Sequence, residues 1–154
     1  MKFKQAFTTL SNLSFAQLWL LGEIWLVFLK WDLLVSLFHY RYWQLTFDKT
    51  TALMENKANF PQVLAIIRLS EKVGRNHLRK MNCLRRCLCQ KQLLERRHYP
   101  CELHIGVQIT DDKLKAHSWL SYNDVLINDS AEIVSQYTEL EQSANTSILF
   151  ALRG

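Results

Sequence analysis

The spacing of the apolar residues changes once along this chain, close to Tyr99 and Pro100. Before that point, apolar residues return every three or four positions, which is the period of a helix that packs on one side. After it, in the stretch CELHIGVQI, apolar and polar residues alternate, which is the period of a half-buried strand. Because a proline disfavours helix at the residue before it, Pro100 marks the boundary. The sequence therefore predicts an α+β fold in which the helices come first.

The strand pattern continues into a predicted hairpin. Thr110 to Lys113 is a turn signal, and the stretch KAHSWLSYNDVLIND follows it with Asn123-Asp124 at its tip, where both residue types favour tight turns. Strands joined by such short turns pair antiparallel. One face of the first strand is expected to carry the alternating apolar residues Cys101, Leu103, Ile105, Val107 and Ile109.

The part of the chain before the cysteines reads as helical. Helices are predicted over residues 14–28, 32–43 and 63–73, with a polar, broken connector at 48–61. Gly74 is expected to end the third helix, since glycine commonly follows a helix C-terminus. With 154 residues, the chain is expected to form one domain, or one domain with a helical extension.

Charge is distributed unevenly, with a basic middle and an acidic end. Residues 68–97 hold ten Lys/Arg against two Glu, whereas residues 98–154 hold three Lys/Arg against eight Asp/Glu. Any anionic partner is therefore expected at residues 68–97. Interleaved aromatic residues and a helix-turn-helix pattern are lacking there, so a solvated or partner-facing surface is favoured over a nucleic-acid site.

The N-terminal third is strongly apolar but does not read as a membrane span. Glu23, Lys30 and Asp32 interrupt WLLGEIWLVFLKWDLLVSLF, and charges are costly near the centre of a transmembrane helix. Buried or interfacial helices fit better, with peripheral membrane contact as the alternative. The start MKFKQAFTTLSNLSF lacks the compact apolar region of a signal peptide, and four cysteines are too few for a disulfide scaffold. These features favour a cytoplasmic protein with free thiols.

Three of the four cysteines lie in the stretch MNCLRRCLCQ. Asn82 is a good N-cap for a helix over residues 83–97, which places Cys83 in the first turn, where the helix dipole and neighbouring arginines lower the pKa of a thiol. Cys87 and Cys89 lie deeper in the helix and are expected to be packing residues. Zinc is disfavoured, because only one short Cys pair has the spacing that structural zinc prefers.

A thiolate nucleophile needs a base and a group that orients the base. Among the five histidines, His117 is favoured, because a three-residue loop at 122–124 would place Asp129 directly opposite it on the neighbouring strand. A two-residue loop would turn Asp129 to the other face, so this interpretation requires an odd-length loop or a bulge. His104 is expected to be an exposed strand residue rather than a second base. The candidate triad is Cys83, His117 and Asp129.

This order of motifs resembles the transglutaminase-like superfamily of papain-type cysteine enzymes. Within it, the chain is similar to the C-terminal catalytic half of the leader peptidase, or B protein, of lasso-peptide biosynthesis, over roughly residues 63–140. The matching pieces are Cys83-Leu84, Leu93-Leu94, Ile105-Gly106-Val107, Ala116-His117-Ser118-Trp119, Asn128-Asp129 and Tyr137. The chain departs from the pattern in its extra cysteines, Cys87 and Cys89, and in the Asn-Asp loop tip, where glycine is more usual.

The resemblance implies a bacterial, cytoplasmic cysteine peptidase that removes the leader from a ribosomally made precursor peptide. It also implies a transglutaminase-like core over residues 61–154, after a helical extension over residues 1–60. Because residues 1–60 lack the alternating strands of a leader-recognition domain, a separate recognition protein is expected as a partner. The ATP-dependent macrolactam cyclase is the expected second partner, and neither a cofactor nor a metal is expected.

Two alternatives stay open at this point. The same triad could pass the acyl group to an amine rather than to water, which would make the protein an acyl or amide transferase. In the other alternative, the protein is a non-catalytic basic adaptor that binds nucleic acid or membrane through residues 68–97.

Overall fold

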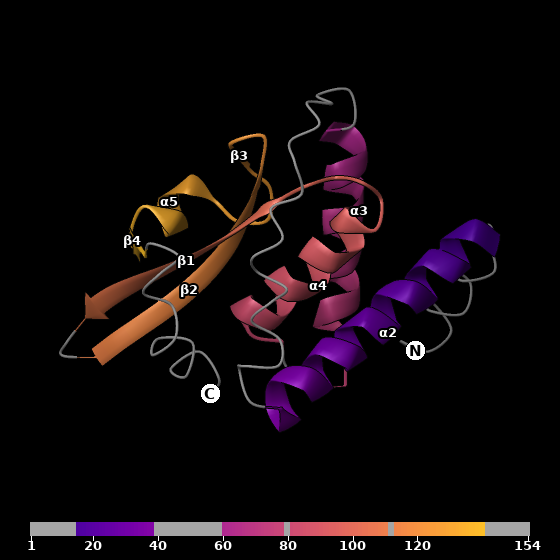
Figure 1. The fold of residues 1–154 in the computed structure, drawn as a ribbon, viewed down its shortest axis with the longest axis horizontal. Helices are drawn as coiled ribbons and strands as arrows, with labels where there is room; N and C mark the ends of the chain where they lie inside the picture. Colours follow the sequence, from indigo (N-terminus) through magenta and orange to yellow (C-terminus); the bar gives the residue numbers. More distant parts are fainter. Residues whose placement is uncertain (1–14, 39–59, 79–80, 111–112, 141–154) are drawn as a thin grey trace, which may run out of the picture.

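The computed structural model describes residues 15–38, 60–78, 81–110 and 113–140. Its helices are α2 (Phe15–Leu37), α3 (Phe60–Arg75), α4 (Cys83–Glu95) and the short α5 (Ala131–Val134). Its strands are β1 (Glu102–Thr110), β2 (Lys113–Tyr122), β3 (Val125–Leu126) and β4 (Thr138–Glu139). Helix α4 lies between the sheet and the helices α2 and α3, so it forms the centre of the molecule (Figure 1). The predicted α+β fold, with helices first, is confirmed.

The first two predicted helices are one helix. The separate helices expected over residues 14–28 and 32–43 are wrong for the described part, because α2 runs without a break to Leu37; residues 39–43 lie outside the description. Its charged residues do not end the helix, because α4 supplies their partners. The Nζ of Lys30 donates to the Oε1 of Gln92 (3.1 Å), and the carboxylate of Asp32 lies 3.6 Å from the Nε of Arg85.

Helix α2 carries apolar side chains on all sides. Ile24, Phe28, Trp31 and Val35 are buried against the rest of the molecule, whereas Phe15, Trp19, Leu26 and Leu37 are exposed. In the described ranges, no helix combines the length and the apolar character that crossing a membrane requires.

Helix α3 begins one residue before Pro61, which is tolerated in a first helical turn because the N–H groups there have no partner within the helix. Most of the connector predicted at 48–61 lies outside the described residues. Gly74 does not end the helix as predicted, because it lies in the last turn before Arg75. A Cβ at Gly74 would approach the Phe28 ring of α2 to 3.1 Å, so the glycine serves close packing of the two helices.

Helix α4 begins at Cys83, as predicted, and its N-cap is confirmed: the Oδ1 of Asn82 accepts a hydrogen bond from the N–H of Arg85 (3.0 Å). The helix ends at Glu95, two residues earlier than expected. His98 takes a left-handed conformation (φ 59°), and the N–H of Tyr99 bonds back to the carbonyl of Leu94 (3.0 Å). This closure turns the chain into β1.

The four strands lie in the order β3-β2-β1-β4, and every neighbouring pair is antiparallel. β1 pairs over its whole length with residues 113–121 of β2, with Gly106 opposite His117. The connection from β2 to β3 is a two-residue turn, because Tyr122 pairs with Val125. Both turn residues, Asn123 and Asp124, have positive φ (49° and 61°), the conformation of the turn that best fits the twist of a hairpin. The three-residue loop predicted at 122–124 is therefore wrong.

Candidate active site

Cys83 is the first residue of α4 and is partly exposed. Burial of the thiol works to raise its pKa, but hydrogen bonds with His117 and Ser118 and the charge of His117 outweigh burial, so the pKa of Cys83 lies below its usual value of 9.0. The unpaired N–H groups of a first helical turn also favour a negative sulfur. The fold therefore gives Cys83 the surroundings of a reactive thiolate.

His117 connects the thiol with a carboxylate. Its Nε2 lies 2.5 Å from the Oδ2 of Asp129, and its hydrogen bond with Cys83 is the largest cause that raises its pKa above 6.5. Desolvation opposes this rise, whereas the hydrogen bond and the charge of Asp129 add to it. The structure thus brings together the three residues that the sequence singled out.

The shortness of β3 explains how Cys83 contacts both His117 and Ser118, although successive strand residues point to opposite faces. β3 pairs with β2 only at Ser121 and Tyr122, which leaves the stretch of β2 around His117 at the edge of the sheet within the described structure. The start of α4 lies close to this edge, where the Cys83 thiol contacts both His117 and Ser118.

Asp129 reaches His117 because the pairing between β2 and the returning chain is interrupted. The N–H of Ile127 donates to the carbonyl of Leu120 (3.0 Å), as in a regular ladder. The N–H of Leu120, however, donates to the side-chain Oδ1 of Asn128 (2.8 Å) rather than to a backbone carbonyl. The strand geometry ends at this point, so Asp129 is not bound to the face that a two-residue loop would give it. Of the two conditions that the sequence allowed for this pair, an odd-length loop or a bulge, the structure excludes the loop and shows an irregularity in the returning chain.

The other three thiols are buried and differ from Cys83 in their pKa. Burial raises the pKa of Cys87 to about 12, and its sulfur donates to the carbonyl of Ser118 (3.3 Å). Burial likewise raises the pKa of Cys101 to about 12 and that of Cys89 well above 9.0. These three thiols are buried in the core, in agreement with the packing role predicted for Cys87 and Cys89. In the described ranges, no cluster of three or more His, Cys, Asp or Glu residues could hold a metal ion.

Two aromatic residues and one glycine shape the surroundings of His117. The ring of His117 lies 5.1 Å from that of Tyr137 and 6.2 Å from that of Trp119, centroid to centroid. A Cβ at Gly106 would come within 2.7 Å of the Trp119 ring and 2.9 Å of the Cβ of Tyr137, so this close packing requires glycine. The sequence placed Gly106 and Tyr137 only in the family pattern and gave them no role.

A second histidine–carboxylate pair lies on the same sheet. The Nδ1 of His104 is 2.5 Å from the Oε1 of Glu139, and its Nε2 is 2.7 Å from the Oγ of Ser121. The ring of His104 stacks on Trp119 at 5.8 Å. His104 is thus not the freely exposed strand residue that the alternation predicted, because its side chain is 20% exposed and held on both ring nitrogens.

A series of hydrogen-bonded polar side chains runs from α3 through α4 to the segment that carries Asp129. The Nδ2 of Asn128 donates to the Oε1 of Gln90 (2.8 Å), and the Nε2 of Gln90 donates to Ser70 and Glu71. Gln90 has no exposed surface, so its amide serves this chain and not the site. The sequence offered no signal for this network beyond the Asn-Asp pair.

The basic segment at 68–97 is partly neutralised within the described part of the molecule. Five of its ten cationic residues form ion pairs with acidic residues of the chain: Arg85, Arg86, Lys91, Arg96 and Arg97. Glu23 of α2 lies 2.5 Å from Arg97, and although burial opposes the shift, hydrogen bonds and the charges of both arginines lower the pKa of Glu23. Much of the positive charge therefore fastens α2 and α3 to α4.

The comparison with protein families gives one match. The family described as "Transglutaminase-like superfamily" (Transglut_core3) matches residues 25–142, from within α2 to just beyond β4. Neither the curated proteins nor the solved structures include a significant match to the chain.

Proposed function

Because the chain belongs to the transglutaminase-like superfamily, we propose that it is a cysteine peptidase whose triad is Cys83, His117 and Asp129. The observation that carries this proposal is the position of His117 between a thiol and a carboxylate. One of its ring nitrogens, Nε2, is taken by Asp129, so the other nitrogen, Nδ1, is the one available to the sulfur. A carboxylate on one nitrogen fixes the tautomer and favours the charged ring that balances a thiolate.

The proposed reaction follows from this arrangement. The Cys83 thiolate attacks the carbonyl carbon of a peptide bond, and the charged His117 gives its proton to the leaving amine. His117 then takes a proton from water, which hydrolyses the thioester and regenerates the thiol. The N–H of Cys83, at the start of α4, is the proposed donor to the oxyanion that forms in both steps. Asp129 keeps the imidazole oriented throughout.

The proposed substrate is the leader–core junction of a ribosomally made lasso-peptide precursor. This step rests on the motifs from Cys83-Leu84 to Tyr137, which resemble those of the lasso-peptide leader peptidases. A separate recognition protein would hold the leader, and the ATP-dependent macrolactam cyclase would take the freed core. The proposed compartment is the bacterial cytoplasm.

The test is mass spectrometry of a cognate precursor peptide incubated with this protein and a leader-recognition protein. A single cut between leader and core, absent with Cys83→Ala, is expected. A matched control is Cys89→Ala, which removes a buried thiol of the same helix whose hydrogen bond goes to the carbonyl of Val27 in α2, and this variant is expected to leave the cut in place once folding is verified. An intact precursor, despite folded protein and demonstrated leader binding, would refute the peptidase proposal.

The acyl-transfer alternative is separated by the same spectra. Hydrolysis adds the mass of water to the cut peptide, whereas transfer adds the mass of the amine that accepts the acyl group. A product that carries an added amine, formed only when Cys83 is present, would keep the triad and change the reaction class.

A further inference from the structure

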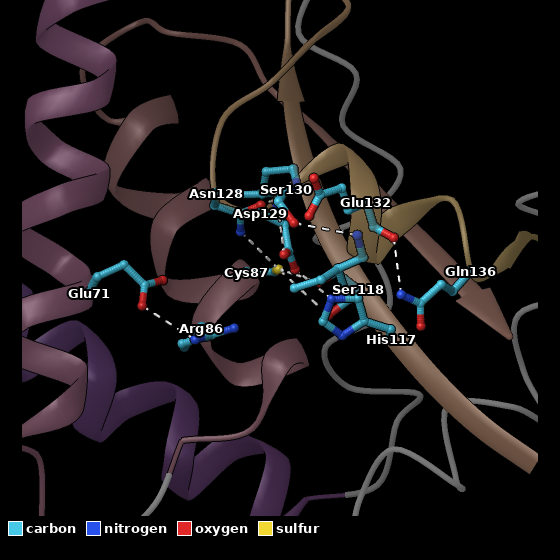
Figure 2. A network of polar contacts seen from close by, with 12 residues as sticks. Glu71, Arg86, Cys87, His117, Ser118, Asn128, Asp129, Ser130, Glu132 and Gln136 are labelled. Atoms are coloured by element: carbon cyan, nitrogen blue, oxygen red, sulfur yellow. Dashed lines mark hydrogen bonds and ion pairs between the residues drawn. The ribbon is translucent and has the colours of Figure 1, made fainter. Parts of the chain in front are cut away.

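Asn128 has three hydrogen-bonding contacts although it lies in an irregular segment. Its Oδ1 accepts from the N–H of Leu120 (2.8 Å), and its Nδ2 donates to the Oε1 of Gln90 (2.8 Å) and to the sulfur of Cys87 (3.3 Å). Figure 2 shows Asn128 beside Cys87, directly before Asp129. The side chain therefore links strand β2, helix α4 and the segment that carries the carboxylate of the site.

The orientation of both amides is fixed by the groups at the ends of this chain. A carboxylate only accepts, so Glu71 must face the Nε2 of Gln90 (2.8 Å), and the Oε1 of Gln90 must then face Asn128. Asn128 therefore donates from its Nδ2 to Gln90. Its Oδ1 is left to accept from the N–H of Leu120, a group that only donates. Each of these hydrogen bonds has only one possible donor and one possible acceptor. Turning over either amide would place a donor against a donor or an acceptor against an acceptor.

The hydrogen bonds from Glu71 through Gln90 to Asn128 hold the segment of Asp129 in its position relative to α4. The regular ladder with β2 ends at Ile127, and β3 comprises only Val125 and Leu126, so strand pairing no longer holds the backbone at Asp129. The contact with Gln90 anchors the preceding residue on the helix that begins with Cys83. One helix thus carries the thiol at its start and the anchor of the acid two turns later.

We propose that Asn128 is a positioning residue, which through Gln90 sets Asp129 against His117 at the right distance from the helix of Cys83. This inference rests on the proposed function of the triad. Asn128 does not touch a reacting atom of that triad; it acts through the placement of its neighbour.

Because each hydrogen bond between Glu71, Gln90 and Asn128 has a fixed donor and acceptor, one substitution can break the series and a second can restore it. Asn128→Asp keeps an oxygen for the N–H of Leu120 but sets a second oxygen against the Oε1 of Gln90. Gln90 cannot turn its amide over, because its oxygen would then face Glu71. Adding Glu71→Gln removes this obstacle, since a glutamine there can donate to the turned Gln90 and still accept from Arg86, which now lies 3.3 Å from Glu71. Glu71→Gln alone is the matched control, because its oxygen can accept from Gln90 as the carboxylate does, while its amide nitrogen then faces Arg86 and only the contact with Arg86 is lost.

The main measurement is the rate at which iodoacetamide alkylates Cys83 as a function of pH, because it needs no substrate. Asn128→Asp is expected to move the onset of reactivity toward pH 9, the usual thiol pKa, since an imidazole without Asp129 stabilises the thiolate less. The double variant is expected to return the onset to the wild-type pH, and Glu71→Gln alone to leave it there. Circular dichroism and thermal unfolding verify that each variant is folded.

The second measurement is precursor cleavage, normalised to the titrated active sites. Asn128→Asp is expected to lower kcat by about 10²-fold, the effect of a misplaced catalytic group, with KM within about twofold. The double variant is expected to recover most of that loss. A purely structural role would change the folded fraction, but not the alkylation onset or the kcat of the folded enzyme.

Two results would overturn the proposal. One is a folded Asn128→Asp variant with wild-type alkylation and kcat. The other is a double variant that stays as perturbed as the single one, which would assign the effect to the added charge rather than to position. If the wild-type protein cuts no precursor, the proposed function fails, whereas the alkylation profiles still decide whether Asn128 positions the pair.

Discussion

The sheet carries two histidine–carboxylate pairs that look alike in their shortest contacts. His117 meets Asp129 at 2.5 Å, and His104 meets Glu139 at 2.5 Å. The ring of Trp119 lies beside both histidines. Each histidine also has a candidate nucleophile, which is the thiol of Cys83 for His117 and the hydroxyl of Ser121 for His104.

The pairs differ in what surrounds them. The side chain of Asp129 is 11% exposed, whereas that of Glu139 is 55% exposed, so solvent screens the second pair far more. Cys83 stands at a helix start, whereas Ser121 stands within β2, between Glu102 of β1 and Leu126 of β3. A short contact between histidine and carboxylate is therefore a poor marker of a catalytic pair. The setting of the nucleophile separates the two.

Substituting the histidines should give the largest contrast. His117→Asn removes the proton carrier and is expected to lower kcat/KM for precursor cleavage by about 10⁴-fold, the upper range for general acid–base catalysis. His104→Asn is expected to change it by less than about threefold. The measurement is cleavage kinetics on variants shown to be folded. Equal losses in both variants would mean that the two pairs act together and that the comparison fails.

Substituting the two carboxylates should give the same contrast in kcat, with smaller losses than the histidine variants. Asp129→Asn leaves the imidazole without the charge that favours its protonated form, so a loss of about 10²-fold in kcat is expected. Glu139→Gln keeps a hydrogen-bonding side chain at an exposed position and is expected to stay near the wild-type rate. A loss of the same size in Glu139→Gln would give β4 a part in catalysis.

The pH dependence of activity gives a further test of the His117–Asp129 pair and its thiol. The pKa of Cys83 is lowered, so the thiolate persists below pH 9.0 and is lost when the pH falls through the pKa that Cys83 has in the folded protein. The pKa of His117 is raised, so the imidazolium persists above pH 6.5 and is lost when the pH rises through the pKa that His117 has in the folded protein. Activity is therefore expected to follow a bell-shaped curve bounded by these two losses.

The same titration distinguishes the thiols. At pH 7, iodoacetamide is expected to label Cys83 about tenfold faster or more than Cys87 and Cys101, whose pKa is about 12. Peptide mapping by mass spectrometry assigns the label. His117→Asn should return the reactivity of Cys83 toward that of an ordinary thiol, whereas His104→Asn should not. A profile for Cys83 that neither histidine changes would break the link between thiol and imidazole.

The smallest effect is expected at the glycine beneath the shared aromatic rings. Gly106→Ala would place a Cβ 2.7 Å from Trp119, so a loss of about 1–3 kcal/mol in the free energy of unfolding is expected from overpacking. Gly22→Ala is the matched control, because nothing lies within 4 Å of the added Cβ in an exposed part of α2, and a gain of up to about 1 kcal/mol is expected. Urea unfolding measures both. An unchanged free energy of unfolding for Gly106→Ala would mean that the Trp119 ring can move aside at little cost.

The parts of the site that local chemistry determines could be predicted from the sequence. Asn82 caps α4 and places Cys83 in its first turn because both effects act within a few residues. The position of Asp129 could not be derived in the same way. The hairpin has a two-residue turn, and Asp129 reaches His117 only because Asn128 leaves the ladder to bind Gln90, a contact across 38 residues of sequence.

The same reason explains the misjudged helix boundary. Lys30 and Asp32 read as an interruption in an apolar stretch, and only the presence of Gln92 and Arg85 on α4 turns them into contacts within one continuous helix. Tertiary partners, which no local pattern contains, decided both cases.

Helix α4 also sets how the site responds to partial unfolding. It contributes Cys83, it anchors Asn128, and through Arg85 and Gln92 it holds α2, so loosening this one helix would separate the thiol from the imidazole and release the acid together. The reactive sulfur thus belongs to the helix that contacts α2, α3 and the sheet, rather than to a loop. An incompletely folded chain would carry only an ordinary thiol, and Cys83 reactivity would report on the native fraction of a sample.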